Sequence, residues 1–121
     1  MVHDNFSGWQ VYRGGSYHYD PSILINNNQD CLIHMWTCSP GTGSTQWDVI
    51  RYHYSNDNGQ TWSLDETALK PISCSHDTYS ACDPDVVKID KYYYIGYTST
   101  TNLNATQNQL FLALSLIPNG N

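Results

Sequence analysis

The fold that this chain predicts is decided by one short stretch, S-N-D-N-G-Q-T-W at residues 55–62. It directly follows residues 49–54, in which the side chains alternate as they do along a strand. Asp and Asn side chains hydrogen-bond to nearby backbone, glycine adopts a positive φ, and tryptophan gives the returning chain a large apolar anchor. The stretch therefore predicts a β-hairpin turn whose structural residues are Ser55, Asp57, Gly59, Thr61 and Trp62.

Working outward from this turn, the chain contains an internal repeat. The sequence D-P-S-I-L-I at residues 20–25 returns as D-P-D-V-V-K-I at residues 83–89. Beyond these segments the apolar pattern of residues 30–55 falls on that of residues 90–115, at an offset of 60. Repeats of about this length, with three or four short strands each, are typical of the blades of a β-propeller.

Short strands between clusters of turn-forming residues dominate the pattern, and no long stretch has helical periodicity, so the predicted fold class is all-β. The predicted strands are 22–25, 32–37, 48–55 and a weak 62–69 in the first repeat, and 85–89, 92–99 and 109–115 in the second. We expect a first blade over about residues 17–70 and a second, incomplete blade over about residues 80–121. Two incomplete blades leave sheet edges and faces exposed, which predicts a segment of a larger propeller.

Composition excludes two classes of partner. The net charge is −6, with only 5 Lys plus Arg, which argues against binding to nucleic acid. No run of apolar residues is long enough for a membrane span. The His and Cys residues show no spacing typical of a zinc site, so we predict no metal.

The stretch at residues 55–62 resembles the Asp-box, or bacterial neuraminidase repeat, of sialidases and other β-propeller proteins. Residues 9–115 as a whole, with an Asp-Pro at the start of each repeat, resemble the five-bladed propellers of the glycoside hydrolase family 43 and family 32 superfamily. The resemblance implies a glycosidase with a carbohydrate as its partner, no cofactor, and the remaining blades in the same protein. With the low lysine content, it also implies an extracellular or periplasmic location, with the leader absent from this chain.

The same resemblance implies roles for two aspartates. In that superfamily, acidic residues at the starts of the innermost strands line a central funnel, and Asp20 and Asp83 begin equivalent strands of adjacent blades. By resemblance, Asp20 is the candidate base or nucleophile, and Asp83 is an electrostatic or sugar-hydroxyl partner. The alternative is that each aspartate only caps a turn beside its proline.

One departure from the family pattern concerns the general acid. The only glutamate is Glu66, in an outer strand or loop just past the predicted turn, where it is poorly placed for this role. We therefore expect the acid to lie outside this chain and the chain alone to be inactive. A non-catalytic carbohydrate-binding or adhesion propeller, which keeps the fold without the chemistry, stays open as the alternative function.

Aromatic residues near the predicted funnel mouth are candidates for sugar stacking. Trp36 and Tyr97 end the second strands of the two blades, and Tyr19 directly precedes Asp20. The alternative for Trp36 and Tyr97 is ordinary packing between blades, since large aromatic side chains dominate protein cores.

Four cysteines, at positions 31, 38, 74 and 82, leave the disulfide pairing open. Cys31 and Cys38 are an odd number of residues apart along one predicted strand, so their side chains point to opposite faces and are not expected to pair. Cys38 with Cys82, Cys74 with Cys82, and four unpaired thiols all remain possible.

Overall fold

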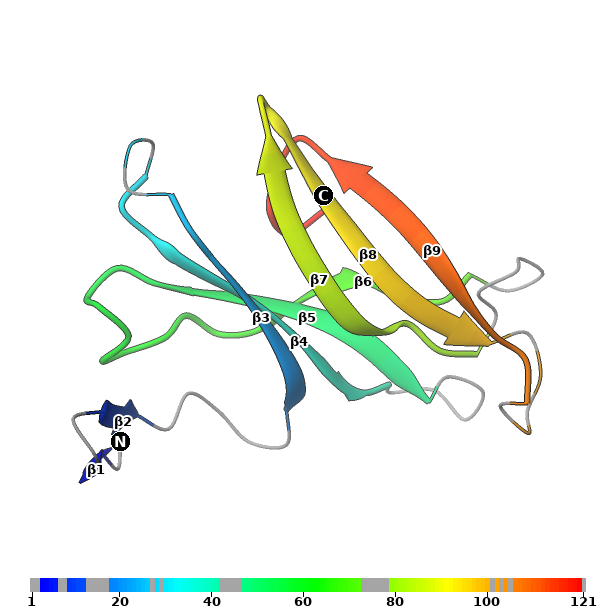
Figure 1. The fold of residues 1–121 in the computed structure, drawn as a ribbon, viewed down its shortest axis with the longest axis horizontal. Coiled ribbons are helices and arrows are strands. Elements are labelled where there is room, and N and C mark those ends of the chain that lie inside the picture. The colour runs from blue at the N-terminus through cyan, green and yellow to red at the C-terminus, as the bar shows by residue number, and fades with distance from the viewer. Residues whose placement is uncertain are drawn as a thin grey trace.

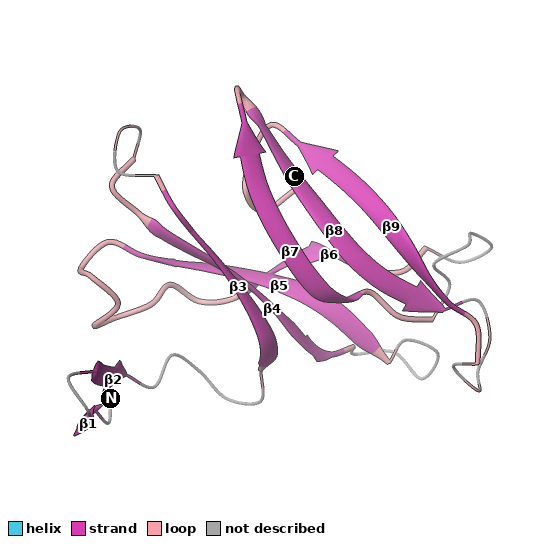
Figure 2. Ribbon diagram, in the orientation of Figure 1, coloured by secondary structure: helices cyan, strands magenta, loops and turns pink. Residues whose placement is uncertain are grey.

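The computed structural model describes residues 3–6, 9–12, 18–26, 28, 30–41, 47–72, 79–100, 102, 104 and 106–120, the first two ranges for their backbone only. Every regular element in these residues is a β-strand, which confirms the predicted all-β class (Figures 1 and 2). None of the described residues forms a helix with the length and apolar character of a membrane span.

The strands form three antiparallel sheets (Figure 1). A small hairpin, which the sequence did not predict, comes first and consists of β1 (His3–Phe6) and β2 (Trp9–Tyr12). The first blade has four strands in chain order: β3 (Tyr19–Ile25), β4 (Ile33–Pro40), β5 (Asp48–Ser55) and β6 (Glu66–Leu69). The second blade has three: β7 (Cys82–Ile89), β8 (Tyr92–Thr100) and β9 (Asn108–Ser115).

The predicted strands are present, with boundaries that differ by about three residues or more at three kinds of place. The second strand of the first blade ends at Pro40, three residues later than predicted. The first strand of each blade begins about three residues earlier than predicted, at Tyr19 and Cys82, because each continues through an irregular Asp-Pro step. The fourth strand starts only at Glu66, since Trp62 belongs to the turn before it.

The pairing register supports the internal repeat. Trp36 on β4 lies opposite Tyr52 on β5, and Gly96 on β8 lies opposite Leu112 on β9. Each residue of the second pair follows its counterpart by 60 positions (96 − 36 and 112 − 52), as the apolar pattern predicted. The two sheets are therefore repeats of one structural unit in three dimensions.

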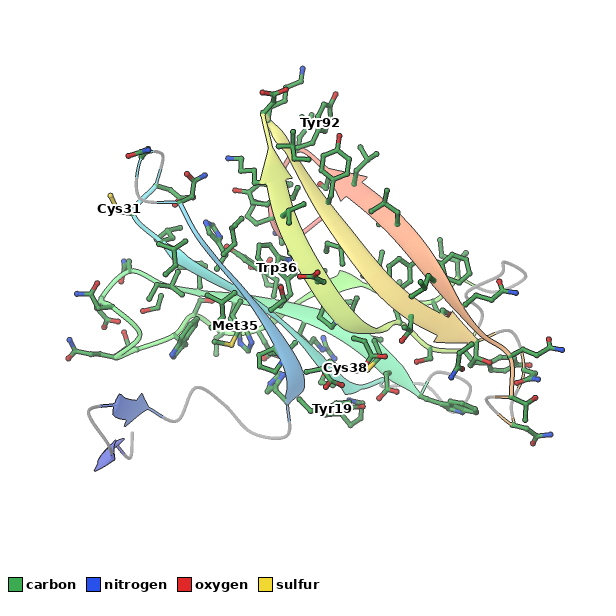
Figure 3. The ribbon with its side chains drawn as sticks, in the orientation of Figure 1. Tyr19, Cys31, Met35, Trp36, Cys38 and Tyr92 are labelled. Atoms are coloured by element: carbon green, nitrogen blue, oxygen red, sulfur yellow. A yellow bond between two sulfur atoms is a disulfide. The ribbon has the colours of Figure 1, made fainter. Side chains whose placement is uncertain are left out.

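The hydrophobic core lies where the two blades pack together, and Figure 3 places Trp36 there. Trp36 and Ile50 of the first blade are fully buried against β7 and β8, which contribute Val86, Tyr93, Ile95 and Tyr97. The indole Nε1 of Trp36 donates a hydrogen bond of 2.9 Å to the carbonyl oxygen of Pro118, in the turn that follows β9. One tryptophan thus binds the first blade to the end of the second.

The expected hairpin turn at residues 55–62 connects β5 to β6. The Ser55 hydroxyl accepts a hydrogen bond from the Gly59 N–H (2.9 Å) and donates one to the Asp57 carboxylate (2.8 Å). That carboxylate also accepts the backbone N–H of Thr61 (2.8 Å) and its hydroxyl. The Trp62 indole donates to the Gly59 carbonyl (3.0 Å), and Gly59 has a φ of 88°. The polar groups of the motif therefore find their hydrogen-bond partners within the turn itself.

This network makes the contribution of Asp57 to stability dependent on pH. The pKa of Asp57 is lowered, first by the hydroxyl of Thr61 and next by its backbone N–H. A lowered pKa in the folded state means that the stabilisation is complete above the pKa of the unfolded carboxyl, about 4, and is lost as pH falls through the folded value. We expect Asp57→Asn to be less stable than the unchanged protein near pH 7, and the gap to close on acidification.

Urea unfolding midpoints measured from pH 7 to pH 2 test this expectation. Asn56→Ala, a neutral change in the same turn, is the control, and its effect should stay constant with pH. A gap for Asp57→Asn that is equally large at pH 2 and pH 7 would contradict the role given to the carboxylate.

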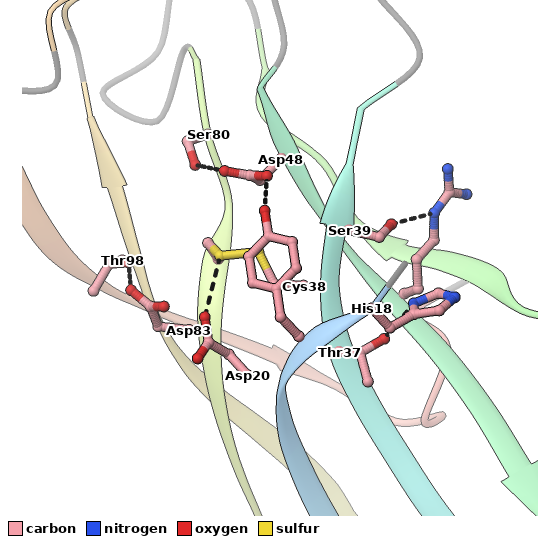
Figure 4. The surroundings of a disulfide bond; sticks show 12 residues. His18, Asp20, Thr37, Cys38, Ser39, Asp48, Ser80, Asp83 and Thr98 are labelled. Carbon is pink, nitrogen blue, oxygen red and sulfur yellow. Dashed lines mark hydrogen bonds between the residues drawn. A yellow bond between two sulfur atoms is a disulfide. The ribbon is translucent and has the colours of Figure 1, made fainter. Parts of the chain in front are cut away.

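A disulfide between Cys38 and Cys82 joins β4 of the first blade to the start of β7 in the second. This is one of the pairings that the sequence left open, and it confirms that Cys31 and Cys38 do not pair. The other candidate partner, Cys74, lies outside the described residues. The link crosses between the blades, at the end of the sheets where the candidate site lies (Figure 4).

Candidate functional site

Three carboxylates lie at one end of the two blades. β3, β5 and β7 all start at this end, and each carries an aspartate within its first two residues: Asp20, Asp48 and Asp83. In the first blade this follows from topology, because every second strand of an antiparallel sheet runs in the same direction. Figure 4 shows the three aspartates around the disulfide.

Asp20 and Asp83 share an unusual backbone conformation. Each precedes a proline and has a positive φ, 49° for Asp20 and 51° for Asp83. Each also lies where the pairing with the next strand shifts register. Aspartate tolerates this left-handed region better than most residues, because its short polar side chain can hydrogen-bond locally. The repeat therefore reproduces the local geometry as well as the residue type, and both side chains are exposed.

Asp83 influences the ionisation of the neighbouring Asp20 carboxyl group. The pKa of Asp20 is raised, first by a side-chain hydrogen bond with Asp83, then by burial, and then by the negative charges of Asp83 and Asp48. Two neighbouring carboxylates repel each other, so one of them keeps its proton to a higher pH than an isolated aspartate would. The Asp83 carboxylate is itself held by the hydroxyl of Thr98, on β8.

Asp48 is a member of this group that the sequence analysis did not identify. Its carboxylate accepts hydrogen bonds from the hydroxyls of Tyr19 and of Ser80, the latter at 3.4 Å. A signal for it exists in the sequence, since an acidic residue opens the third strand, and the first and third strands of an antiparallel blade start at the same end.

A hollow beside these carboxylates contains the aromatic side chain of Trp47. Its lining includes Trp47, Asp48, Asp83 and Thr98. The indole of Trp47 lies 6.2 Å from the ring of Tyr79, centroid to centroid, and both are half-buried. Tyr19, one of the three aromatic residues expected at the mouth, is 37% exposed and contacts Asp48, a residue of the lining, through its hydroxyl. Trp47 and Tyr79 were missed because both are in loops without a repeat partner.

Trp36 and Tyr97, the other two aromatic residues expected at the mouth, are not brought to the carboxylates. Trp36 is fully buried and Tyr97 is 6% exposed, and both belong to the core between the blades. The ring of Tyr97 stacks on Phe111 at a centroid distance of 5.5 Å. Trp36 and Tyr97 are therefore packing residues between the blades, as the alternative interpretation predicted. The apolar faces of adjacent blades bury their largest side chains against each other.

Glu66 also lies apart from the carboxylates, as expected. It starts the outermost strand of the first blade, opposite Tyr52, and its carboxylate accepts a hydrogen bond of 2.7 Å from Asn119. In the described part of the chain, metal-binding atom types gather at Asp20, Cys38 and Cys82, all within 4.8 Å of one another. The two sulfur atoms form the disulfide and are not thiolate ligands, so this group does not fit a metal.

A second polar cluster lies within the first blade. The imidazole of His34, 1% exposed, contacts the Asp30 carboxylate through Nε2 (2.9 Å) and the Tyr52 hydroxyl through Nδ1 (2.7 Å). The same ring lies 5.9 Å from that of Trp36. Burial raises the pKa of Tyr52, which keeps the phenol protonated. All polar atoms of this imidazole are satisfied inside the core, so the cluster is structural.

Comparisons of the sequence with protein-family models and with curated proteins give no match. Comparison with solved structures finds Zg3597, a family 117 glycoside hydrolase from Zobellia galactanivorans, with a TM-score of 0.69 and 17% identity over 91% of this chain and 40% of that one. An endo-arabinase from Bacteroides thetaiotaomicron has a TM-score of 0.62 and 22% identity, over 84% of this chain and 32% of its own.

A sialidase from Trypanosoma rangeli is also similar, with a TM-score of 0.57 and 18% identity over 81% of this chain and 17% of that one. This chain thus spans less than half the length of each of these structures. At such identities the likeness establishes the fold alone. The two sheets of this chain are β-propeller blades, matching a part of larger propeller-type glycosidases.

Proposed function

We propose that this chain is part of a glycoside hydrolase that cleaves glycosidic bonds of a poly- or oligosaccharide through Asp20 and Asp83. The observation that carries the proposal is the carboxyl pair itself. Two aspartates at equivalent positions of adjacent blades lie at the same end of the fold, close enough for Asp83 to raise the pKa of Asp20. The fold likeness to three kinds of glycosidase supports the same reaction class.

The chemistry assigned to Asp20 follows from its raised pKa. Once deprotonated, a carboxylate with a higher pKa is a stronger proton acceptor, which suits a general base or nucleophile. Asp83 then acts by charge on Asp20 or by holding a sugar hydroxyl. Glycosidases hold their two reacting carboxyl groups at least roughly 5 Å apart, on opposite sides of the bond. Asp20 and Asp83 lie at the same end of adjacent blades, at the starts of β3 and β7, so we assign both to one side of the bond and the general acid to another part of the protein.

Contacts with the sugar are assigned to the side chains around the same hollow. Tyr19 and the indole of Trp47 supply aromatic surface, on which the C–H face of a sugar ring can pack. Asp48 and the hydroxyl of Ser80 supply polar groups beside it. Aromatic and hydrogen-bonding surfaces side by side match the amphipathic character of a carbohydrate.

Further blades of the same protein are proposed as the partner of the second blade. Its outward face carries Leu110 and Leu112, which are 84% and 68% exposed. In the first blade the equivalent positions, 60 residues earlier, are Ile50 and Tyr52, and both are buried under the second blade. The repeat therefore supports another blade on the outward face, packed as the second blade is packed on the first.

The location and the finer family assignment are also proposals. The disulfide between the blades supports an oxidising compartment, in line with an extracellular or periplasmic protein. The network among Ser55, Asp57 and Thr61 supports assigning residues 55–62 as an Asp-box. Together with the Asp-Pro pair at the start of each blade, this network also supports a relationship to the propellers of glycoside hydrolase families 43 and 32.

Hydrolysis assays test the function. We expect the protein that carries this chain to release the aryl group from at least one of aryl arabinosides, xylosides, fructosides or sialosides, and the 121-residue chain alone to release none. Turnover by the chain alone would contradict the model of an acid supplied from elsewhere. Binding of glycans by the longer protein without any hydrolysis would favour the non-catalytic carbohydrate-binding alternative.

A further inference from the structure

We propose that the Cys38–Cys82 disulfide is a positioning element that holds the carboxyl groups of Asp20 and Asp83 together by tying the strand starts of the two blades. Its role in hydrolysis rests on the function proposed above, whereas its effect on the carboxyl pair can be measured without a substrate.

The disulfide joins the two aspartates along a short structural path. Cys82 directly precedes Asp83 in the chain. Cys38 lies opposite Tyr19 in the pairing of β3 with β4, and Tyr19 directly precedes Asp20. The Cα atoms of the two cysteines are 5.1 Å apart. The covalent link therefore crosses between the blades at the level of the carboxyl pair, as Figure 4 shows.

The disulfide also contacts the carboxylate of Asp20 directly. Cys38 is fully buried and Cys82 is 8% exposed, and the Sγ of Cys82 lies 4.0 Å from an Asp20 carboxylate oxygen. A carboxylate against a buried, apolar disulfide has less water around it on that side, which disfavours its charged form. The disulfide thus restrains the backbone behind the pair and shapes its surroundings.

The other contacts between the blades explain why a covalent link matters at this point. The N–H of Val86 donates to the Ser22 hydroxyl at 3.0 Å, but this bond lies further along β3 and β7 than the aspartates do. The large core residues likewise lie deeper between the sheets. At the strand starts, repulsion among Asp20, Asp48 and Asp83 favours separation of the blades. Backbone hydrogen bonds from Trp47 N–H to the Tyr79 carbonyl (2.8 Å) and from Ala81 N–H to the Asp48 carbonyl (3.1 Å) hold the start of β5 to the segment before β7. The disulfide adds the link from β4, whose Cys38 lies opposite Tyr19, so it is the contact that restrains the side of the pair on which Asp20 lies.

Replacing both cysteines by serine in the full chain tests the proposal. We expect the Cys38→Ser/Cys82→Ser variant to keep its far-ultraviolet circular dichroism, because the core and the Ser22 contact remain. Followed by carbon-13 NMR of the aspartate carboxyl groups, the pKa of Asp20 should fall toward that of an ordinary aspartate. Separation weakens the hydrogen bond with Asp83 and the repulsion from Asp83 and Asp48, and all of these raise that pKa in the intact protein. Cys31→Ser, which leaves the disulfide in place, is the control and should shift nothing.

An unchanged Asp20 pKa in the folded double variant would overturn the positioning role. If the serine variant unfolds, Cys38→Ala/Cys82→Val keeps apolar side chains in the buried space and takes its place. The same titration after reduction of the folded wild-type protein by excess dithiothreitol gives a third measurement. That reaction converts the disulfide to two thiols and the dithiol to its cyclic disulfide. A fall in the pKa of Asp20 in these samples, combined with no glycosidase activity in the wild-type protein, would keep the positioning role and reject the proposed function instead.

Discussion

Replacing Asp20 by asparagine is expected to slow glycoside hydrolysis by about 10²–10⁴-fold in the protein that carries this chain, with the fold intact. The amide keeps the shape of the carboxylate and most of its hydrogen bonds, but it neither accepts a proton nor attacks the sugar. The side chain is exposed at the open end of the blades, so few packing contacts depend on it. Initial rates on the best aryl glycoside, together with a thermal unfolding curve for each protein, provide the measurement.

The matched control is Asp83→Asn, one blade away in the same backbone conformation. We expect a smaller effect, mainly on KM, because Asp83 supports Asp20 and the sugar without taking the proton. This variant should also shift the acidic limb of the rate profile to lower pH, since removing the charge of Asp83 lowers the pKa of Asp20. Full activity of Asp20→Asn would remove Asp20 from the reaction and favour its role as a turn residue.

The largest expected loss of stability is that of Trp36→Ala, at about 3–5 kcal/mol. The indole is fully buried between the blades, and its Nε1 donates to the carbonyl of Pro118. Truncation removes apolar contacts with both sheets, leaves a cavity, and leaves that carbonyl without this donor. Urea denaturation, with the free energy extrapolated to water, measures the loss.

Two further variants separate the contributions at this position. Trp36→Phe keeps an aromatic ring in the core and should recover part of the lost stability. Trp62→Ala removes the same residue type from a half-buried position at the turn, and it should cost less than Trp36→Ala. If Trp36→Ala keeps the wild-type unfolding midpoint, the packing between the blades contributes less to stability than its burial implies.

Local features of this chain could be predicted from the sequence alone. The hairpin at residues 55–62 followed from side chains that bond within a few positions of themselves, and the network of Ser55 and Asp57 has that form. The strands followed from alternation, and the two similar sheets from the repeat at an offset of 60. The sequence predicted that Asp20 and Asp83 lie at the same end of the two blades, because each opens the first strand of its repeat with an Asp-Pro pair. All of these depend on interactions between residues near in sequence or on copies of one pattern.

Only the tertiary structure decided which of these residues meet in the site. Trp36 and Tyr97 fit a sugar platform as well as a core position until the packing of the two blades is seen to bury both. The disulfide between Cys38 and Cys82 spans 44 residues, and the contact of Tyr19 with Asp48 joins different strands. Such contacts depend on the angle and depth at which one blade packs on the next. That packing is set by many side chains of both sheets together, which is why short sequence patterns alone do not reveal it.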